Sequence, residues 1–283
     1  MSKIRVTILQ TQVFEDKRAN LQQAEKLLGQ VAFQNVDLAI LPEMFNCPYQ
    51  TGRFPVYAEE EGGESFRACS AMAEKYGIYL AAGSMPERDR QGRIYNTAYV
   101  FDRQGRRIAK HRKLHLFDID VEGGQSFRES DTLSAGNEIT VFDTEFCRMG
   151  ICICYDLRFP EIFRLMALDG AEVILVPAAF NMTTGPAHWE LLFRQRAVDN
   201  QAWFIGVASA RDCQAGYVSW GHSIVTDPWG TVVMQMDEKP GVRVVEIDLD
   251  MGERVRRELP FLSQRRTDLY RVERTKQGTG EFE

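Results

Sequence analysis

The sequence contains no long hydrophobic run and no excess of basic residues. No stretch approaches the roughly 20 consecutive apolar residues that a membrane-spanning helix requires. The first residues, 1–9, are too few and too alternating for a secretory signal. Lysine and arginine number 34 against 40 aspartates and glutamates, a formal net charge of −6, which argues against a nucleic-acid-binding surface. We therefore expect neither a membrane nor a nucleic acid as a partner.

Cysteine is also scarce, and the six cysteines do not follow the spacing of a disulfide-bonded scaffold. Scattered cysteines in a chain of 283 residues are typical of a reduced protein, so we expect a cytoplasmic location. Cys152 and Cys154 form a C-x-C pair, but no second pair completes the four ligands of a structural zinc site. We expect no metal and no organic cofactor.

The length and composition fit one large α/β domain. With 44% hydrophobic and 26% charged residues, the chain can fill a substantial core and solvate its surface. Strand-like segments alternate with helical ones, and later strands follow one another directly, which predicts mixed sheets covered by helices. Without a repeat or a linker, we expect a single domain over residues 1–270 and a polar, detachable tail over residues 271–283. The predicted strands are Ile4–Leu9, Leu38–Leu41, Ile78–Gly83, Thr97–Phe101, Ile108–His111, Ile139–Phe142, Met149–Ile153, Val173–Val176, Phe204–Ala208, Ser223–Thr226, Thr231–Gln235 and Val242–Ile247.

Helices and turns are predicted from spacing and from turn residues. One apolar stripe at helical spacing consists of Leu21, Ala24, Leu27, Leu28 and Val31. A second helical run, after Pro186, contains Leu191, Leu192, Gln195, Ala197 and Val198. The segments 102–105 and 227–230 are predicted hairpin turns. The span 115–136 has little strand pattern, and because long loops inside compact domains are usually functional or disordered, we expect it to wall a pocket.

Cys154 follows an apolar strand and precedes a polar turn. A nucleophile on a sharp strand-to-helix elbow projects into a pocket, where backbone N–H groups can face an oxyanion. A buried cysteine more often behaves as a small hydrophobic residue, and this is the interpretation that we give to the other five. Cys154 is the predicted nucleophile.

Glu43 and Lys113 follow two other predicted strands in the same way. Apolar neighbours of Glu43 would raise the pKa of its carboxyl group towards the range of a general base, although most glutamates are solvated. Lys113 lies in a basic run, which usually forms a solvated face, and it can turn inward only where its strand ends. The residues alone leave both interpretations of Lys113 open. A thiol, a carboxylate and an ammonium at strand ends indicate an acyl-transfer site with glutamate as the base.

Three sequence blocks around these residues resemble the signature blocks of the nitrilase superfamily of carbon–nitrogen hydrolases. These blocks are Leu41–Glu43, Arg112–His115 and Cys154–Glu161, in the family's order and at about its spacing. Segments 127–130 and 221–223 also fit the family, and the similarity extends from Arg5 to about Tyr270. Within the superfamily, the block Phe180–Glu190 resembles the omega-amidase branch most closely.

The resemblance implies a four-layer α-β-β-α sandwich and a homodimer. It implies catalytic roles for Glu43, Lys113 and Cys154, and a supporting role for Glu129, whose alternative is an exposed loop acid. The backbone N–H of Tyr155 would join Lys113 in binding the oxyanion. One departure from the family is an acidic residue within 121–124, where relatives commonly have proline. The resemblance therefore does not decide which contacts this loop makes with the pocket.

Arg158 is the predicted carboxylate-binding residue, because a guanidinium can bind a carboxylate through two hydrogen bonds. The alternative is a structural salt bridge to Glu161. The other predicted substrate-binding residues are Tyr49, Tyr155, Phe180, Met182, Thr183 and Thr184. Phe180 and Met182 would limit the acyl group, Tyr49 would cover the pocket from the Glu43 side, and the threonines would offer hydroxyl groups. The resemblance implies hydrolysis of the terminal amide of 2-oxoglutaramate or 2-oxosuccinamate to the acid and ammonia.

Two other enzymatic activities fit the same three catalytic residues, namely hydrolysis of nitriles and of N-carbamoyl amines. A non-catalytic scaffold with the same fold is a hypothesis from a different class. The presence of Glu43, Lys113 and Cys154 together argues against a scaffold, and labelling by an electrophile such as iodoacetamide would separate the two.

Overall fold

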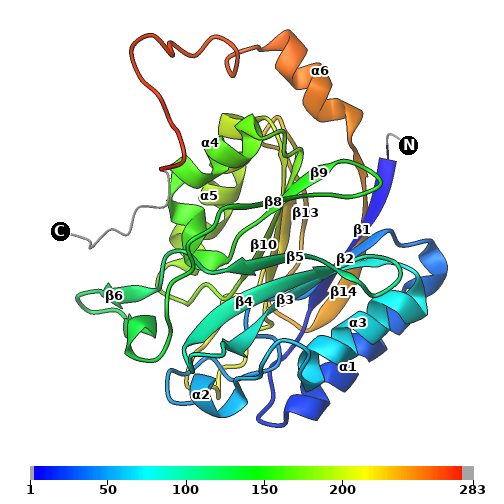
Figure 1. Ribbon diagram of the computed structural model, residues 1–283, viewed down its shortest axis with the longest axis vertical. Helices are drawn as coiled ribbons and strands as arrows, with labels where there is room; N and C mark the ends of the chain where they lie inside the picture. The colour runs from blue at the N-terminus through cyan, green and yellow to red at the C-terminus, as the bar shows by residue number, and fades with distance from the viewer. Residues whose placement is uncertain (1–2, 276–283) are drawn as a thin grey trace.

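Two six-stranded mixed sheets form the centre of the computed structural model, which describes residues 3–275 (Figure 1). In each sheet three neighbouring strands are parallel, β1-β2-β3 and β9-β10-β11, and the flanking strands are antiparallel. The first sheet consists, in spatial order, of β14 (Gly241–Asp248), β1 (Lys3–Gln10), β2 (Leu38–Ile40), β3 (Tyr79–Arg88), β4 (Ile94–Phe101) and β5 (Arg107–Arg112). The second consists of β13 (Val232–Gln235), β12 (Ile224–Thr226), β11 (Trp203–Ala208), β10 (Val173–Ala178), β9 (Arg148–Ile151) and β8 (Thr140–Asp143).

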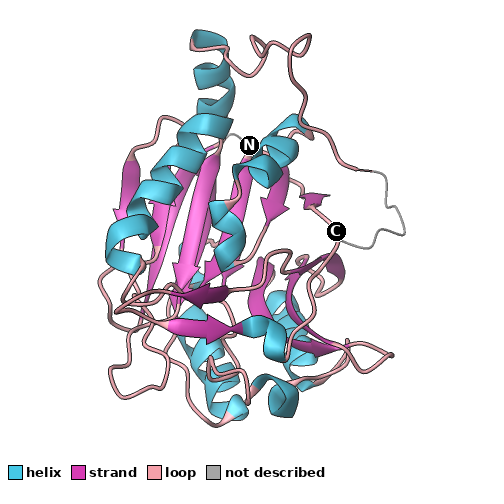
Figure 2. Cartoon of the chain, turned by 90° about the vertical axis from the view of Figure 1, so that its left-hand side faces the viewer, coloured by secondary structure: helices cyan, strands magenta, loops and turns pink. Residues whose placement is uncertain are grey.

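Helices cover the outer face of each sheet, as Figures 1 and 2 show. Helices α1 (Lys17–Gly29) and α3 (Glu64–Tyr76) pack on the first sheet, and α4 (Pro160–Leu168) and α5 (Gly185–Asn200) pack on the second. The inner faces of the two sheets contact each other through β1 with β11, β3 with β10 and β5 with β8. The predicted four-layer α-β-β-α sandwich is confirmed.

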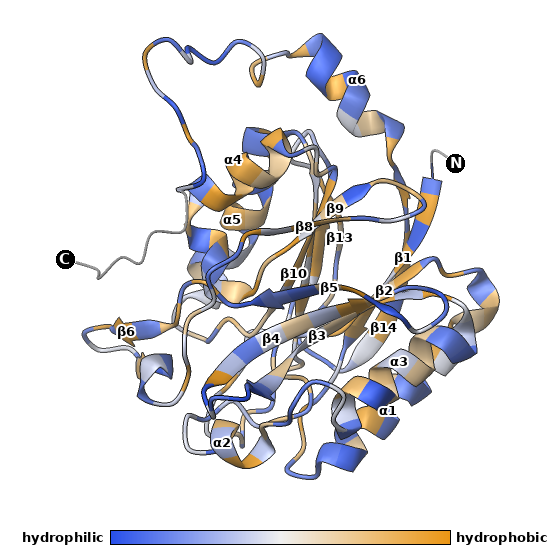
Figure 3. Ribbon diagram, in the orientation of Figure 1, coloured by the Kyte–Doolittle hydropathy of each residue, from blue (hydrophilic) through white to orange (hydrophobic). Residues whose placement is uncertain are grey.

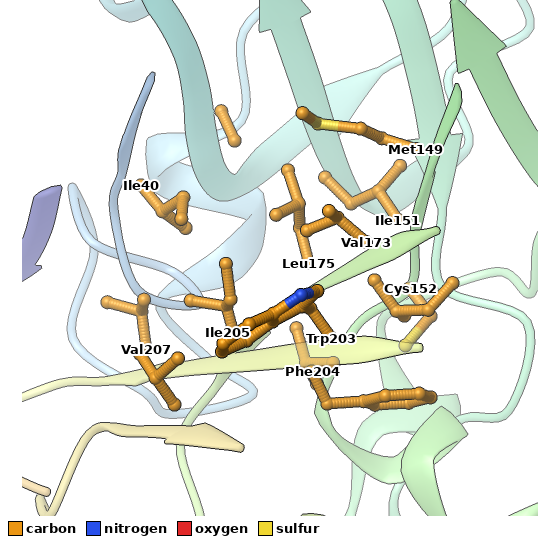
Figure 4. Close-up of a cluster of buried hydrophobic side chains, with 14 of the residues drawn as sticks. Ile40, Met149, Ile151, Cys152, Val173, Leu175, Trp203, Phe204, Ile205 and Val207 are labelled. Carbon is orange, nitrogen blue, oxygen red and sulfur yellow. The ribbon is translucent and has the colours of Figure 1, made fainter. Parts of the chain in front are cut away.

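Alternation along the strands separates the core into layers. In β4, Ala98 and Val100 point into the core between the sheets, whereas Tyr99 and Phe101 point outward under α1 and α3. Figure 4 shows Ile40 of the first sheet among side chains of the second, including Ile205. Because each fully buried aliphatic side chain contributes roughly 1.5–3 kcal/mol, this double-sided burial holds the strand ends, and therefore the site, in fixed positions.

All twelve predicted strands are present, with ends that differ by a few residues. The predicted turns at 102–105 and 227–230 connect β4 to β5 and β12 to β13. The prediction of an irregular span over 115–136 is wrong in part, because β6 (Asp118–Asp120) and β7 (Ser126–Arg128) form an antiparallel hairpin there. Each of these strands has only three residues and is mostly polar, so neither shows the hydrophobic alternation of a core strand.

The first predicted helical stripe is buried in α1 at Leu21, Ala24 and Leu28, and Val31 is buried just after the helix. The second predicted helical run is confirmed as α5, although Leu191 is 62% exposed and Val198 is 38% exposed. Besides Ala197, this helix buries Trp189 and Phe193 against β11 and β12. The larger aromatic side chains bury more area than leucine and therefore decide which face of the helix points inward.

The short helix α2 (Phe54–Tyr57) lies near the site, and α6 (Asp250–Glu258) follows the last strand. Figure 1 shows α6 and the segment after it extending away from the sheets, and Figure 3 shows α6 as largely hydrophilic. The segment then returns to the body, where Arg274 pairs with Asp169 after α4. Of the predicted tail, 271–283, residues 276–283 lie outside the described part, and the division at residue 270 stays a prediction.

Among the described residues, none of the helices combines the length and the apolar character needed to cross a lipid bilayer.

Candidate active site

The three predicted catalytic side chains converge at the ends of three strands. Glu43 follows β2, Lys113 follows β5 and Cys154 follows β9. All three are buried, and Lys113 has no exposed surface at all. Glu129, at the end of β7, is equally buried, so it is not the exposed loop acid of the alternative interpretation.

Lys113 lies between two carboxylates. Its Nζ atom is 2.8 Å from Oε1 of Glu43 and 2.9 Å from Oε2 of Glu129. The Tyr49 hydroxyl donates to Glu129 and also lies 3.1 Å from Oε1 of Glu43. A buried ion pair of this kind requires further hydrogen bonds to offset desolvation, and Asn96 supplies one to Glu43 at 2.8 Å. The ion pair is therefore held in place by groups on three segments of the chain.

Burial and charge act in opposite directions on these groups. Burial alone would lower the pKa of the Lys113 ammonium, but the charges of Glu129 and Glu43 outweigh burial and raise it. Burial raises the pKa of the Glu43 carboxyl more than Lys113 lowers it. The pKa of the Cys154 thiol is raised by burial and by Glu43. The lysine is therefore a stable cation, whereas the thiol requires a base to lose its proton.

Glu43 is the carboxylate that interacts with the Cys154 thiol. Its Oε1 atom accepts hydrogen bonds from Lys113 and Asn96, while its Oε2 atom has no hydrogen-bond partner among the described residues. One oxygen thus fixes the carboxylate and the other is available for proton transfer.

Cys154 begins a 3-10 turn, Cys154–Arg158, that leads into α4 at Pro160. Its backbone has a φ of +47°, a left-handed conformation that costs a non-glycine residue roughly 1–2 kcal/mol. The predicted elbow is therefore present, with the strain concentrated at the predicted nucleophile. The backbone N–H of Ala179, just after β10, faces the sulfur and offsets part of the rise in the pKa of the thiol.

Asp156 connects this elbow to the end of β5, a role that the sequence analysis did not identify. Its buried carboxylate accepts hydrogen bonds from the backbone N–H of Ile153 at 3.0 Å and of His115 at 2.9 Å. The rings of His111 and His115 approach it at 3.3 and 2.8 Å. These two histidines therefore interact with Asp156 rather than with Cys154. Hydrogen bonds from His111 and His115 outweigh desolvation and lower the pKa of Asp156.

Asn96 and Tyr217 are two further residues that the sequence analysis missed. Asn96 is an amide within the otherwise largely apolar strand β4, and this break in the pattern was the available signal. Tyr217 donates to the carbonyl of Ala179 and packs 4.5 Å from the ring of Tyr49. It lies in an irregular segment before β12, where no local pattern marks it.

The structure places Arg158 beside aromatic rings, half-buried. Its guanidinium lies 5.1 Å from the ring centre of Phe180 and 5.6 Å from that of Tyr155. It donates to Nδ1 of His188 at 3.1 Å rather than to Glu161. Phe180 is buried, and Tyr155 packs against Phe117 at 5.1 Å. Phe180 and Tyr155 thus flank Arg158 on the elbow side of the site.

The three residues after Asn181 lie closer to the surface. Met182 and Thr183 are exposed, and Thr183 packs beside Gly124 in the β6-β7 hairpin. Thr184 donates its hydroxyl to Oδ1 of Asn181 at 2.9 Å. Binding of substrate by these residues stays a prediction.

A four-layer fold with a buried thiol, carboxylate and ammonium at its strand ends defines a class of hydrolases with a cysteine nucleophile. Comparison with known proteins identifies the family: the chain matches the carbon-nitrogen hydrolase family over residues 5–257 and belongs to it. It is therefore a hydrolase that acts on carbon–nitrogen bonds.

Several relatives match almost the whole chain. The chain is 47% identical to "Omega-amidase NIT2" of Danio rerio, over 98% of this chain and all of the relative. It is 45% identical to "Omega-amidase NIT2" of Homo sapiens over the same shares. Among solved structures, Saccharomyces cerevisiae Nit3, "a member of branch 10 of the nitrilase superfamily", is 40% identical with a TM-score of 0.87, covering 94% of this chain and 97% of that chain.

Proposed function

We propose that this enzyme is an omega-amidase, which hydrolyses the terminal amide of a small carboxylated amide such as 2-oxoglutaramate or 2-oxosuccinamate. The observation that carries the proposal is the buried arrangement of Glu43, Lys113 and Glu129 beside Cys154. The similarity to omega-amidases over 98% of the chain supports the choice of substrate class. The reaction requires no metal or organic cofactor.

The acylation step begins at the thiol. Glu43 removes the proton from Cys154, and the sulfur attacks the amide carbon to form a tetrahedral intermediate. The Lys113 ammonium and the backbone N–H of Tyr155 bind its oxyanion, and one such donor typically contributes roughly 3–4 kcal/mol. Glu43 then transfers the proton to the nitrogen, the carbon–nitrogen bond breaks, and ammonia departs. The acyl group remains on Cys154 as a thioester.

Deacylation uses the same groups in reverse. A water molecule gives a proton to Glu43 and attacks the thioester carbon. The oxyanion is again stabilised by Lys113, the carbon–sulfur bond breaks, and Glu43 returns the proton to the sulfur. Because Lys113 is held as a cation by two carboxylates, its charge is available in both steps.

Recognition of the acyl end is assigned to Arg158. The guanidinium is half-buried beside Phe180 and Tyr155, with His188 as its polar partner. A partly desolvated guanidinium binds a carboxylate more strongly than an exposed one. Phe180 and Tyr155 would limit the acyl chain to a short one.

The test is an ammonia-release screen over glutamine, asparagine, their 2-oxo acid analogues, N-carbamoyl amines and simple nitriles. We expect the highest kcat/KM with the 2-oxo acid amides. A higher kcat/KM with a nitrile or an N-carbamoyl amine would contradict the proposal and favour one of the related activities.

We also propose that the enzyme is a cytoplasmic homodimer. All six cysteines are free thiols, which is typical of a reducing compartment. An apolar groove lined by Val198, Trp229, Leu259 and other residues opens beside α5 and α6. Trp229 is 58% exposed. A contiguous exposed apolar patch is typical of a subunit interface.

A further inference from the structure

A cavity reaches Glu43 next to the predicted acyl-binding residues, of which it shares only Tyr49. Its lining includes Glu43, Tyr49, Ala179 and Tyr217 at the inner end. At the outer end it passes between Gln50 and the segment that contains Asp212 and Gly216. The empty volume is about 500 Å³ including the open mouth. Arg158 and Phe180 do not line it.

Two of the groups at the inner end also contact or face Cys154. The backbone N–H of Ala179 faces the sulfur, and the Glu43 carboxylate is close enough to raise the pKa of the thiol. The cavity therefore approaches the reacting atoms beside the base. Glu43 handles the proton of both the leaving amine and the incoming nucleophile, so a route that ends at Glu43 is suited to these two molecules.

The charge of the cavity lining differs from that of the predicted carboxylate-binding residue. Glu43 and Asp212 are the charged residues among the described lining of the cavity, and both are acidic. The Arg158 guanidinium lies outside this lining. An acidic lining attracts ammonium and amines and repels carboxylates. A substrate with a carboxylate at one end and an amide at the other is therefore oriented by the acidic lining and the Arg158 guanidinium.

We propose that this cavity is the passage for the leaving amine and for the nucleophile that cleaves the thioester, with its size set by Gln50 and Gly216 and its charge selectivity by Asp212. This inference rests on the proposed function, because it requires an acyl group on Cys154. The passage accepts small neutral or cationic amines in addition to water. In that case the N–H of the amine gives its proton to Glu43, a carbon–nitrogen bond forms, the carbon–sulfur bond breaks, and the sulfur regains the proton.

Size selection is tested with hydroxylamine and O-benzylhydroxylamine, which compete in one reaction for the acyl group of a 2-oxo acid amide. A Cβ atom at Gly216 would lie 2.5 Å from the side-chain nitrogen of Gln50. Gly216→Leu therefore narrows the cavity at this point, and the flexible Gln50 side chain can move to accept the new side chain. Gln50→Ala widens it at the same place. We expect the ratio of benzylated to simple hydroxamate to fall at least tenfold in Gly216→Leu and to rise in Gln50→Ala.

The control is Gln214→Leu, an exposed position in the same segment that does not line the cavity. It should keep the wild-type product ratio. Because the ratio is measured within one tube, it does not depend on how much of each variant folds. A ratio that stays at the wild-type value in both Gly216→Leu and Gln50→Ala overturns the proposed passage.

Charge selection is tested with Asp212→Lys against Gln214→Lys as the matched control. The nucleophiles are neutral hydroxylamine and monocationic ethylenediamine. Asp212→Lys should reduce the share of the cationic nucleophile about tenfold, and the control should not. An equal share in both variants overturns the charge assignment. A wild type that releases ammonia from a 2-oxo acid amide but forms no hydroxamate overturns the passage, whereas a wild type that releases no ammonia from any 2-oxo acid amide overturns the proposed function itself.

Discussion

At the scale of single residues, Cys152 and Cys154 show how two thiols two positions apart acquire different environments. Cys152 is fully buried in the hydrophobic core, whereas Cys154 has a left-handed backbone conformation and faces Glu43. We expect Cys154→Ala to abolish turnover without loss of folding. Cys152→Ala should lose roughly 1–2 kcal/mol in the free energy of unfolding, as a small core truncation, and keep its kcat.

The measurements are kcat and denaturant unfolding of both variants. An inactive Cys152→Ala beside an active Cys154→Ala would reverse the assignment. Labelling with iodoacetamide requires mapping of the modified site, because Cys213 is exposed and competes for the reagent. Adduct formation at Cys154 that requires an intact Glu43 is the informative result.

Glu43→Gln and Lys113→Arg test the charged pair. The first retains the shape of the side chain but removes the base, so acylation and deacylation should both collapse. The second retains the charge but places a planar guanidinium in a fully buried space fitted to an ammonium. We expect kcat to fall by at least a hundredfold in each, measured by ammonia release. Activity within tenfold of the wild type in either variant would exclude the proposed role.

The pH dependence of kcat/KM follows from Glu43. Burial raises the pKa of this carboxyl group, and the group must be ionised to act as a base. Activity should therefore be present above the raised pKa and be lost as the pH falls through it. The acidic limb should lie above the model-peptide value for glutamate, which is about 4.3.

Arg158→Lys tests the recognition of the acyl end. Lysine retains the positive charge but loses the two parallel hydrogen bonds of the guanidinium. KM for a 2-oxo acid amide should rise about tenfold or more, with little change for an uncharged short amide. Steady-state kinetics on both substrates tests this role. Equal increases in KM for the two substrates would mean that Arg158 stabilises the elbow instead of binding the carboxylate.

At the scale of the elements, Asp156 joins the turn that carries Cys154 to the end of the strand that carries Lys113. Its pKa is lowered by His111 and His115, so the ionised form contributes stability above the pKa of the unfolded chain, which is about 3.9. This contribution is lost as the pH falls through the lower folded-state pKa. We expect Asp156→Asn to lose roughly 1–3 kcal/mol in the free energy of unfolding at pH 7.

Denaturant unfolding at several pH values measures this difference. It should be largest at neutral pH and shrink below about pH 4, where Asp156 of the wild type begins to lose its charge advantage. A difference that does not change with pH would show that shape, and not the charge of Asp156, matters at this position.

The sequence predicted the elements whose pattern the core dictates, because strands buried on one or both faces carry long apolar runs. The prediction failed where burial does not determine the order of apolar and polar residues. The β6-β7 hairpin contains Asp118 and Asp120 and buries little, and α5 turns Trp189 and Phe193 inward in place of Leu191. Glu43, Lys113 and Cys154 could be found because each follows an apolar strand. Asp156 and Tyr217 depend on contacts between distant segments, which no local pattern records.

At the scale of the whole molecule, the exposed apolar surface beside α6 predicts self-association. Residues 260–262, which follow α6, are half-buried, while Leu269 and Tyr270 beyond them are 71% and 54% exposed. Light scattering at micromolar concentration should give a particle of about twice the chain mass of 32.4 kDa. A particle of a single chain mass would contradict the proposed dimer. Trp229→Glu should shift the particle towards the single chain.

The pairing of the first and last strands has a consequence for how the chain is made. Strand β1 lies between β2 and β14, and its pairing with β14 runs from Lys3 to Gln10 against Gly241 to Asp248. During synthesis β1 leaves the ribosome before β14 and lacks this neighbour until residue 248 has emerged. An unpaired edge strand is prone to pair with other chains. The nascent protein therefore carries an open sheet edge until β14 is made, and a ribosome stalled before β14 should hold a chain that aggregates or binds chaperones.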